Sequence, residues 1–166
     1  MENMKLGLPT YGFDVSNRVT QYFGTSAELY KQSLGIPAHN GWDVKIKYGD
    51  PILAMHDGIV DKLVYDVPHR TRGNGVQLVS LDGKYMTAYW HLSAFQCNIG
   101  DKITKGQTIG LGGNSGFVRP IPTQTNPQAG THLHIGVKIN GITNEYGGYV
   151  DPAPFLWSEG LKLNIK

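Results

Sequence analysis

The stretch Thr131-His132-Leu133-His134-Ile135-Gly136-Val137-Lys138-Ile139 has the alternating pattern of a half-buried β-strand. Its odd-numbered positions from Leu133 onward are apolar, whereas its even-numbered positions hold two histidines, a glycine and a lysine. Successive side chains of a strand point to opposite faces of a sheet, so one face of this strand is apolar and the other carries the histidines. Asn140-Gly141 follows directly and predicts a tight hairpin to a short return strand.

The rest of the chain is divided by 22 glycines and 9 prolines into similarly short segments. Further strands are predicted at residues 40–47, 52–55, 58–66, 75–81, 84–92 and 106–112. Asp82-Gly83 predicts a second hairpin. One short helix is predicted at residues 26–34, because Thr25-Ser26-Ala27-Glu28 resembles a capping box and Gly35 is a natural stop. Since strands do not alternate with long helices, we expect an all-β fold of mainly antiparallel sheets.

Length and composition exclude several classes of protein. A chain of 166 residues is expected to form a single domain with its own core. The net charge of +2, without a run of lysine or arginine, argues against a nucleic-acid partner. No apolar stretch approaches the ~20 residues of a membrane-spanning helix, and the start of the chain lacks the pattern of a signal peptide. The single cysteine, Cys97, excludes an internal disulfide and is expected to be buried.

A second segment, His39-Asn40-Gly41-Trp42-Asp43, offers an imidazole and a carboxylate four residues apart. Because Trp42 and the next even-numbered residues are apolar, His39 and Asp43 are predicted on the opposite, polar face of their strand. Two imidazoles and one carboxylate can form a zinc site that keeps one position open for water. The residues alone do not decide whether His132 or His134 would bind the metal.

A further histidine, His91, ends the predicted strand 84–92. Met86, Ala88, Trp90 and Leu92 alternate there with Tyr85, Thr87, Tyr89 and His91. The alternation predicts that His91 lies on the polar face, beside tyrosine and threonine. Tyr85 and Tyr89 would then either line a groove or shield the edge of the sheet.

Two segments are predicted to be irregular. Residues 113–130 contain three prolines and lead into the first strand described above, so they are expected to form the rim or lid of a site. Residues 67–74 form a second insertion, in which His69 is expected at the surface, with substrate contact as the alternative. His56 is interpreted as a solvated histidine in a turn.

Together these segments resemble the lysostaphin-type zinc metalloendopeptidases, which are peptidoglycan hydrolases with a small antiparallel β fold and an open groove. The resemblance covers residues 36–157 and depends on four segments in the same order. They are His39–Asp43, Tyr89-Trp90-His91-Leu92, Gly100–Gly110 and His132–His134, with a closing segment at 150–156. Residues 117–129 lengthen a connection that is short in the family, so the resemblance does not extend to a substrate preference.

The resemblance implies one Zn²⁺ ion held by His39, Asp43 and His134, with His91 and His132 as the catalytic pair that handles water and the tetrahedral intermediate. It implies a zinc-dependent endopeptidase of the bacterial cell wall, whether secreted, periplasmic or delivered by a phage, with peptidoglycan peptide as its partner. We expect a monomer. The domain then divides into an N-terminal segment (1–35) packed on the core, a peptidase core (36–157) and a C-terminal tail (158–166).

Two other interpretations compete. The first is a non-catalytic zinc-binding domain that binds cell-wall peptide or regulates another hydrolase. Such members of similar families typically have damaged ligand sets, whereas all five site residues are intact in this chain. The second takes residues 100–110 as the hairpin of a biotinyl- or lipoyl-carrier domain. That interpretation ranks last, because no lysine is placed for modification and the histidines would have no explanation.

Overall fold

The computed structural model describes residues 4–66 and 72–156. In chain order its elements are α1 (Val15–Arg18), β1 (Val19–Gln21), α2 (Ala27–Leu34), β2 (Trp42–Val44), β3 (Pro51–Leu53), β4 (Gly58–Val64), β5 (Asn74–Ser80), β6 (Tyr85–Leu92), β7 (Ala94–Phe95), β8 (Lys102–Ile103), β9 (Thr108–Leu111), β10 (Leu133–Ile139), β11 (Tyr149–Val150) and the 3₁₀-helix η1 (Ala153–Phe155). Every predicted strand is present, and the predicted all-β class is confirmed.

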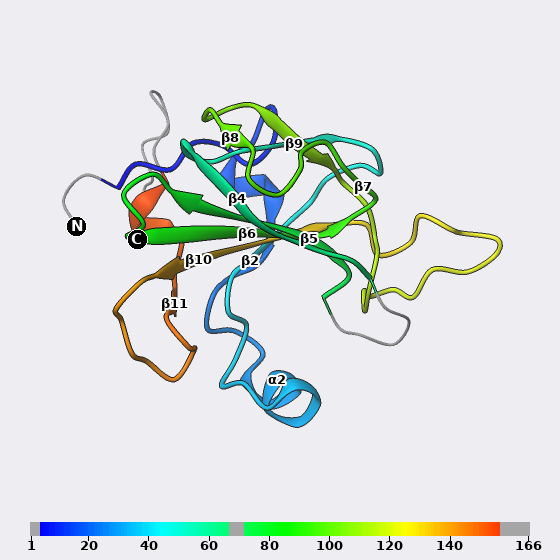
Figure 1. Cartoon of the computed structure of the whole chain (residues 1–166). Coiled ribbons are helices and arrows are strands. Elements are labelled where there is room, and N and C mark those ends of the chain that lie inside the picture. The colour runs from blue at the N-terminus through cyan, green and yellow to red at the C-terminus, as the bar shows by residue number, and fades with distance from the viewer. Residues whose placement is uncertain (1–3, 67–71, 157–166) are drawn as a thin grey trace.

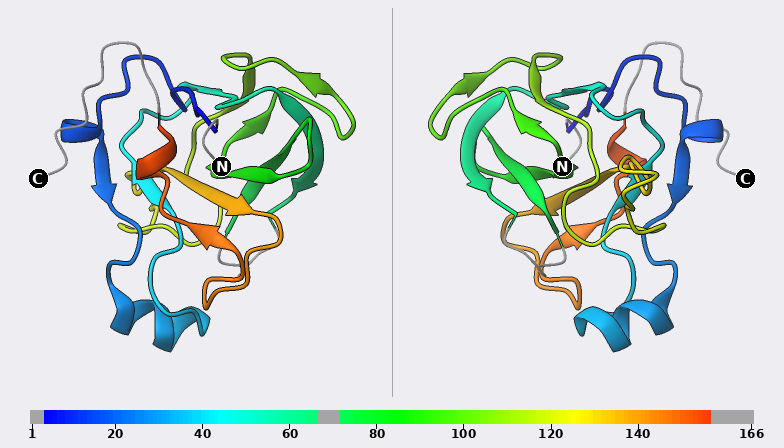
Figure 2. Two further views of the ribbon diagram at one scale, coloured as in Figure 1. Left: turned by 90° about the vertical axis from the view of Figure 1, so that its left-hand side faces the viewer. Right: turned by 90° about the vertical axis from the view of Figure 1, so that its right-hand side faces the viewer.

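The strands form two antiparallel sheets. The larger has eight strands in the order β1-β2-β10-β6-β5-β4-β8, with β11 added to β10, and the smaller has the order β3-β9-β7. The main core contains side chains from both sheets, such as Ile52 and Ile109 from the smaller and Val44 and Leu133 from the larger. The smaller sheet therefore covers one face of the larger, while α2 lies beyond the opposite face (Figure 1). The side views show α2 and the loop before β11 projecting on that side (Figure 2).

Strand β10 has the two faces that its sequence predicts. Leu133, Ile135 and Val137 are fully buried in the core. Its neighbour β2 is shorter than predicted, and the register pairs His134 with Asp43 and Leu133 with Val44. Directly paired residues point to the same face, so the histidine and the carboxylate meet on the side away from the core.

The two predicted hairpins differ in outcome. Gly83 turns between β5 and β6 with φ +69°, as expected. The tight hairpin at Asn140-Gly141 is wrong, because residues 140–148 separate β10 from β11. Asn144 stabilises this longer loop, since its side-chain oxygen accepts hydrogen bonds from the amides of Tyr146 and Gly148 at 3.1 and 2.8 Å. Local hydrogen bonds from this side chain thus favour a longer loop over a tight turn.

Helix α2 begins and ends within one residue of the prediction, and Gly35 ends it in the left-handed conformation. The predicted capping box is absent: Ser26 has a positive φ of 55°, and its hydroxyl accepts a hydrogen bond from Gln21 instead. A second, one-turn helix, α1, was not predicted; Asp14 caps it through the amide of Ser16 at 2.9 Å. No residue of α2 is buried, so this helix covers none of the core.

His56 is not solvated, which corrects the expectation from sequence. Only 3% of the residue is exposed. Its Nδ1 lies 2.8 Å from the carbonyl oxygen of Asp57 and its Nε2 lies 2.9 Å from Thr87 Oγ1. Burial lowers the pKa of this imidazole, although the Asp57 carbonyl opposes the shift. His56 is therefore a neutral core residue with both ring nitrogens engaged.

Other expectations concern the ends and insertions of the chain. Cys97 is buried as predicted, and burial raises the pKa of its thiol to about 11.

The N-terminal segment packs against the end of the described chain. Leu6 is fully buried, and its amide donates to the carbonyl of Phe155 at 2.7 Å. His69 and the tail 158–166 lie outside the described residues. Across the described part of the chain, no helix has the length and apolar character needed to cross a membrane.

Candidate metal centre

Three of the predicted site residues bring their donor atoms together on the outer face of β2 and β10. His39 Nε2 lies 2.9 Å from His134 Nδ1 and 3.1 Å from Asp43 Oδ1, and the latter two atoms are 3.0 Å apart. Burial alone would raise the pKa of Asp43, but hydrogen bonds from His134 and His39 hold it far below its ordinary value. The carboxylate is therefore charged and available as a ligand.

The surroundings of His39 and His134 fix their orientation. His39 is fully buried, and its Nδ1 lies 3.1 Å from the carbonyl oxygen of Tyr22. When a metal ion binds Nε2, this carbonyl can accept a hydrogen bond from a proton on Nδ1, which holds the ring in the orientation that a ligand needs. Burial lowers the pKa of His134, which keeps that imidazole neutral despite the opposing effect of Asp43. Neutral imidazoles and an ionised carboxylate are the forms that bind metal ions.

Gly41 makes room for the ring of His134. A Cβ atom at Gly41 would lie 2.2 Å from the carbonyl oxygen of Ile135 and 2.6 Å from His134 Nε2. Real Cβ atoms do not approach other atoms so closely, and the backbone oxygen cannot rotate away. The glycine within the first ligand segment is thus required by packing against the second.

We therefore expect Gly41→Ala to lower the free energy of unfolding by about 1–3 kcal/mol and to weaken metal binding, because overpacking displaces His134. Chemical denaturation and measurement of bound metal would check this. Gly7→Ala is the matched control, since its added Cβ would meet only the flexible end of the Lys105 side chain. Normal metal content in Gly41→Ala would contradict the expectation.

His91 reaches the same face by a route that strand alternation does not predict. Asn74 pairs with Leu92 and Gly75 with Trp90, so His91 is an extra residue without a cross-strand partner. It has a positive φ of 66°, which marks a β-bulge. The bulge places Trp90 and His91 together on the outer side and returns Leu92 to the core.

The predicted grouping of His91 with the tyrosines and the threonine of its strand is therefore wrong. Thr87 and Tyr89 are fully buried on the core side of β6. The hydroxyl of Tyr89 accepts a hydrogen bond from the amide of Met55 at 2.8 Å, so this tyrosine neither lines the groove nor shields an edge. Tyr85 packs at the edge of the core, with its ring against His56.

His91 and His132 lie side by side next to the three donor atoms. Their ring centroids are 4.4 Å apart. His91 Nδ1 lies 2.8 Å from the carbonyl oxygen of Ser115, and His132 Nδ1 lies 2.8 Å from that of Gly130. In each ring Nδ1 thus donates to a backbone carbonyl, and in the neutral form of the ring Nε2 can accept a proton. Burial and the neighbouring His132 lower the pKa of His91 to about 3, so its neutral form prevails near pH 7.

His132 is set apart from the three donor atoms although it points to the same face. Its Nε2 lies 3.8 Å from Asp43 Oδ2, whereas His134 Nδ1 lies 3.0 Å from Asp43 Oδ1. Among the described residues, the one group of three or more that could hold a metal ion is His39, Asp43 and His134. The geometry therefore favours His134 over His132 as the ligand.

Four of the five site residues, Asp43, His91, His132 and His134, line a groove of about 1080 Å³, whereas the fully buried His39 does not line it. One wall is α2 with Leu29 and Tyr30, and the other is the segment Phe117–Pro120 of the long insertion. Trp90 and Tyr149 also line it. Burial and the charge of Asp43 raise the pKa of Tyr30 to about 12, so its hydroxyl stays protonated. The expectation that residues 113–130 form the rim of a site agrees with this arrangement.

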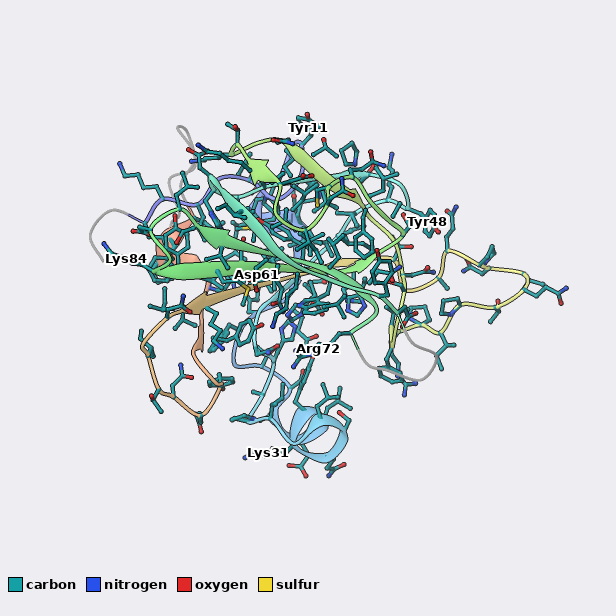
Figure 3. The ribbon with its side chains drawn as sticks, in the orientation of Figure 1. Tyr11, Lys31, Tyr48, Asp61, Arg72 and Lys84 are labelled. Carbon is teal, nitrogen blue, oxygen red and sulfur yellow. The ribbon has the colours of Figure 1, made fainter. Side chains whose placement is uncertain are left out.

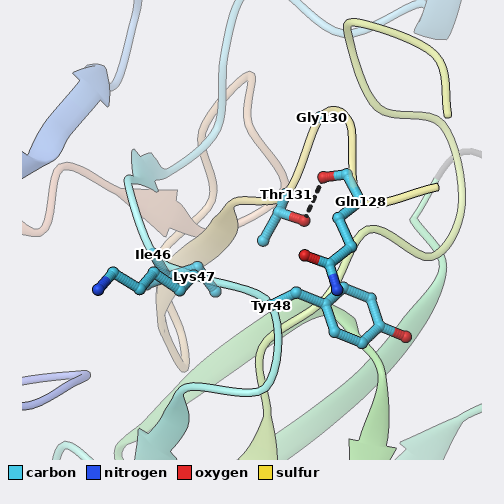
Figure 4. Close-up of a pocket in the computed structure, with 6 residues that line it drawn as sticks. All are labelled: Ile46, Lys47, Tyr48, Gln128, Gly130 and Thr131. Atoms are coloured by element: carbon cyan, nitrogen blue, oxygen red, sulfur yellow. Dashed lines mark hydrogen bonds between the residues drawn. The ribbon is translucent and has the colours of Figure 1, made fainter. Parts of the chain in front are cut away.

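The side chain of Asn114 holds the insertion closed at its base. Its amide nitrogen donates to the carbonyl oxygens of Pro127 and Ala129, both at 2.9 Å. Near the same end, Thr131 Oγ1 donates to the carbonyl oxygen of Gln128 at 2.7 Å (Figure 4). The shallow pocket drawn there shares Gly130 and Thr131 with the groove, but no histidine or carboxylate lines it.

Sequence reasoning missed several residues that position the site. The carbonyl oxygens of Tyr22, Ser115 and Gly130 orient three of the histidines, and backbone groups leave no side-chain signal in a sequence. Arg72 and Trp90 were also missed as groove residues, although a tryptophan directly before a motif histidine is a usable signal. Asp151 Oδ1 accepts hydrogen bonds from Trp42 Nε1 and from the amide of Ala153, both at 3.0 Å.

Residues 37–152 match the family described as peptidase family M23. Glycyl-glycine endopeptidase ALE-1 of Staphylococcus capitis is 33% identical over 126 residues, which are 76% of this chain and 31% of that protein. Peptidoglycan DD-endopeptidase ShyA of Vibrio cholerae is 30% identical over 140 residues, 84% of this chain and 29% of that protein. The chain thus spans about a third of the length of these relatives.

Solved structures show the same fold. The structure described as the identification and structural characterization of LytU has a TM-score of 0.63 and 29% identity, covering 83% of both chains. Lysostaphin from Staphylococcus simulans has a TM-score of 0.64 over 84% of this chain and 48% of its own. At 24% identity, the second likeness concerns the fold alone.

Proposed function

Because the chain belongs to peptidase family M23, we propose that it is a zinc-dependent endopeptidase that hydrolyses peptide bonds in bacterial cell-wall peptidoglycan. The family membership confirms the resemblance inferred from the sequence motifs. The names of two relatives, a glycyl-glycine endopeptidase and a peptidoglycan DD-endopeptidase, support the class of substrate. We propose residues 36–157 as the peptidase core, acting at the cell wall.

The observation that carries this proposal is the triangle of donor atoms from His39, Asp43 and His134, with sides of 2.9–3.1 Å. Zinc binds such atoms at about 2.0–2.2 Å in tetrahedral geometry, which separates the ligands by about 3.3 Å. The triangle needs only a small expansion to hold the ion, and three protein ligands are typical of catalytic zinc sites. Bound zinc would polarise the scissile carbonyl and bring the pKa of water down to about 7.

His91 and His132 supply the proton chemistry in this proposal. Both line the groove, and because Nδ1 of each donates to a backbone carbonyl, Nε2 is the nitrogen that can accept a proton when the ring is neutral. A neutral imidazole at this position can accept a proton from the attacking water, and the resulting imidazolium can donate it to the leaving amine. The imidazolium also stabilises the negative charge that develops on the carbonyl oxygen.

The groove suits an extended peptide. It runs between α2 and the insertion, and its floor is the outer face of the large sheet. A peptide in such a groove can be held largely through its backbone, so small residues of a cross-link need no deep side-chain pocket.

The test is release of peptide fragments from purified peptidoglycan. We expect soluble fragments with new amino termini in mass spectra, loss of release after chelation, and recovery when zinc is restored. Binding to the wall without any release would contradict the proposal and would favour a non-catalytic zinc-binding domain. Release that is unaffected by chelation would contradict the role of the metal.

A further inference from the structure

Three cationic side chains line the groove without an acidic partner. They are Lys45, Arg72 and Arg119. In the part of the chain that the structure describes, no ion pair involves any of the three. The groove has one carboxylate, Asp43, which is engaged by His39 and His134. Beyond the candidate metal centre, every charged side chain among the described residues that line the groove is therefore positively charged.

The two arginines come from adjoining segments of one rim. The amide of Asn74 donates to Ser115 Oγ at 2.9 Å, and a Cβ atom at Gly73 would lie 2.3 Å from the carbonyl oxygen of Ser115. The segment that carries Arg72 thus contacts the start of the insertion that carries Arg119. Ser115 also holds His91, so this rim is next to one member of the proposed catalytic pair.

Each arginine rests on an aromatic ring rather than extending freely into water. Arg72 Cζ lies 5.6 Å from the centroid of Trp90, and Arg119 Cζ lies 5.0 Å from that of Phe117. Figure 3 shows Arg72 on the side of the sheet that faces α2. Stacking of this kind holds a guanidinium in place while its N–H groups remain available to a carboxylate.

Lys45 adds a third positive charge to the groove. It directly follows β2, and it lines the groove together with Asp43. A peptide in the groove would therefore meet a positive charge from β2 as well as those of the arginine rim. A peptide of uncharged glycines would leave all three charges without a partner.

On this charge distribution, and resting on the proposed function, we propose that the groove selects acidic stem peptides, whose residues carry free carboxylates, over neutral glycine cross-bridges. Arg72 and Arg119 are specificity-determining residues that bind a substrate carboxylate on the His91 side of the scissile bond. Charge-assisted hydrogen bonds from arginine to carboxylate are stronger than those to a neutral amide, which supplies the discrimination.

The experiment compares one cross-linked stem peptide with its carboxyl groups free or converted to carboxamides, together with a glycine-only peptide. For the unaltered protein we expect kcat/KM for the carboxylate form to exceed that for the carboxamide form by about tenfold, mainly through KM. Arg72→Gln and Arg119→Gln should each reduce the preference by about threefold, and the double variant should abolish it. Higher ionic strength should weaken it as well.

Lys62→Gln is the matched control, because Lys62 is an exposed cation on β4 that does not line the groove. This substitution should leave kcat/KM unchanged for both the carboxylate and the carboxamide form. Equal cleavage of the carboxylate and carboxamide forms, or equal losses for both in the arginine variants, would overturn the specificity proposal and leave the peptidase proposal standing. Calorimetric measurement of the binding of the same peptides distinguishes failure of the specificity proposal from failure of the peptidase proposal. Preferential binding of the carboxylate form without any cleavage would support the proposed specificity of the groove and overturn the peptidase proposal.

Discussion

His134→Ala is expected to lose both bound zinc and peptidase activity, because it removes one of the three donors in the one such group found among the described residues. Loss of an outer hydrogen-bond partner typically weakens metal binding by about 10–100-fold, and loss of a ligand should exceed this. Bound metal would be measured by elemental analysis and activity by release of wall fragments. Zinc present at 100 times its Kd stabilises a protein by about 2.7 kcal/mol, so zinc should raise the unfolding temperature of the parent but not of this variant.

His132→Ala is the matched control for that experiment. The two histidines lie two residues apart, at the start of β10, and line the same groove. Because His132 Nε2 is 3.8 Å from the nearer oxygen of Asp43, its removal should leave the metal bound while activity falls. If His132→Ala lost zinc and His134→Ala retained it, the assignment of ligands would be reversed.

A second large effect is expected at His91, where replacement should reduce turnover by about 10²–10⁴-fold with the metal retained. The positive φ of this residue allows a chemical role to be separated from a structural one. Glycine adopts that conformation freely, whereas alanine pays ~1 kcal/mol, so His91→Gly should be more stable to unfolding than His91→Ala by about this amount. Both variants should nevertheless be equally inactive, because neither has an imidazole.

Denaturation and steady-state kinetics on the two His91 variants would test this. If the more stable His91→Gly variant had an activity close to that of the parent protein, the role of His91 would be only to shape the bulge. A loss of zinc in both variants would instead place His91 among the ligands, and the division between metal-binding and proton-transferring histidines would have to be redrawn.

Much of the site follows from local pattern. His39 precedes β2 and is fully buried, so strand alternation does not place it. In β2 and β10, however, the apolar residues alternate with possible ligands, and burial of the apolar side leaves Asp43, His134 and the adjoining His132 on the other side. That inference needs no knowledge of which strands pair, because the twofold period belongs to any extended chain. The glycine-marked hairpin between β5 and β6 is equally local, since a positive φ at Gly83 is a property of the turn itself.

His91 and His56 show where local pattern ends. Alternation along β6 grouped His91 with Tyr89, and the two residues lie on opposite faces because a bulge adds one residue opposite Asn74 and Gly75. His56 sits in a polar-looking turn, yet Thr87 from a distant strand meets its ring in the core. Both outcomes depend on residues far away in the sequence, so no window around either histidine contains them.

The sequence by itself determined the all-β class, the two ligand-bearing segments and the face of the sheet on which they lie, because strand periodicity converts hydrophobic spacing directly into sidedness. Tertiary structure placed His134 rather than His132 in the donor triangle, a choice that the residues had left open and that only the family resemblance had implied. It also carried His91 onto the groove and brought two arginines from separate insertions to one rim. These features depend on register, on a bulge and on the close approach of Gly41 to β10, and such interactions between strands are fixed only when the whole core packs.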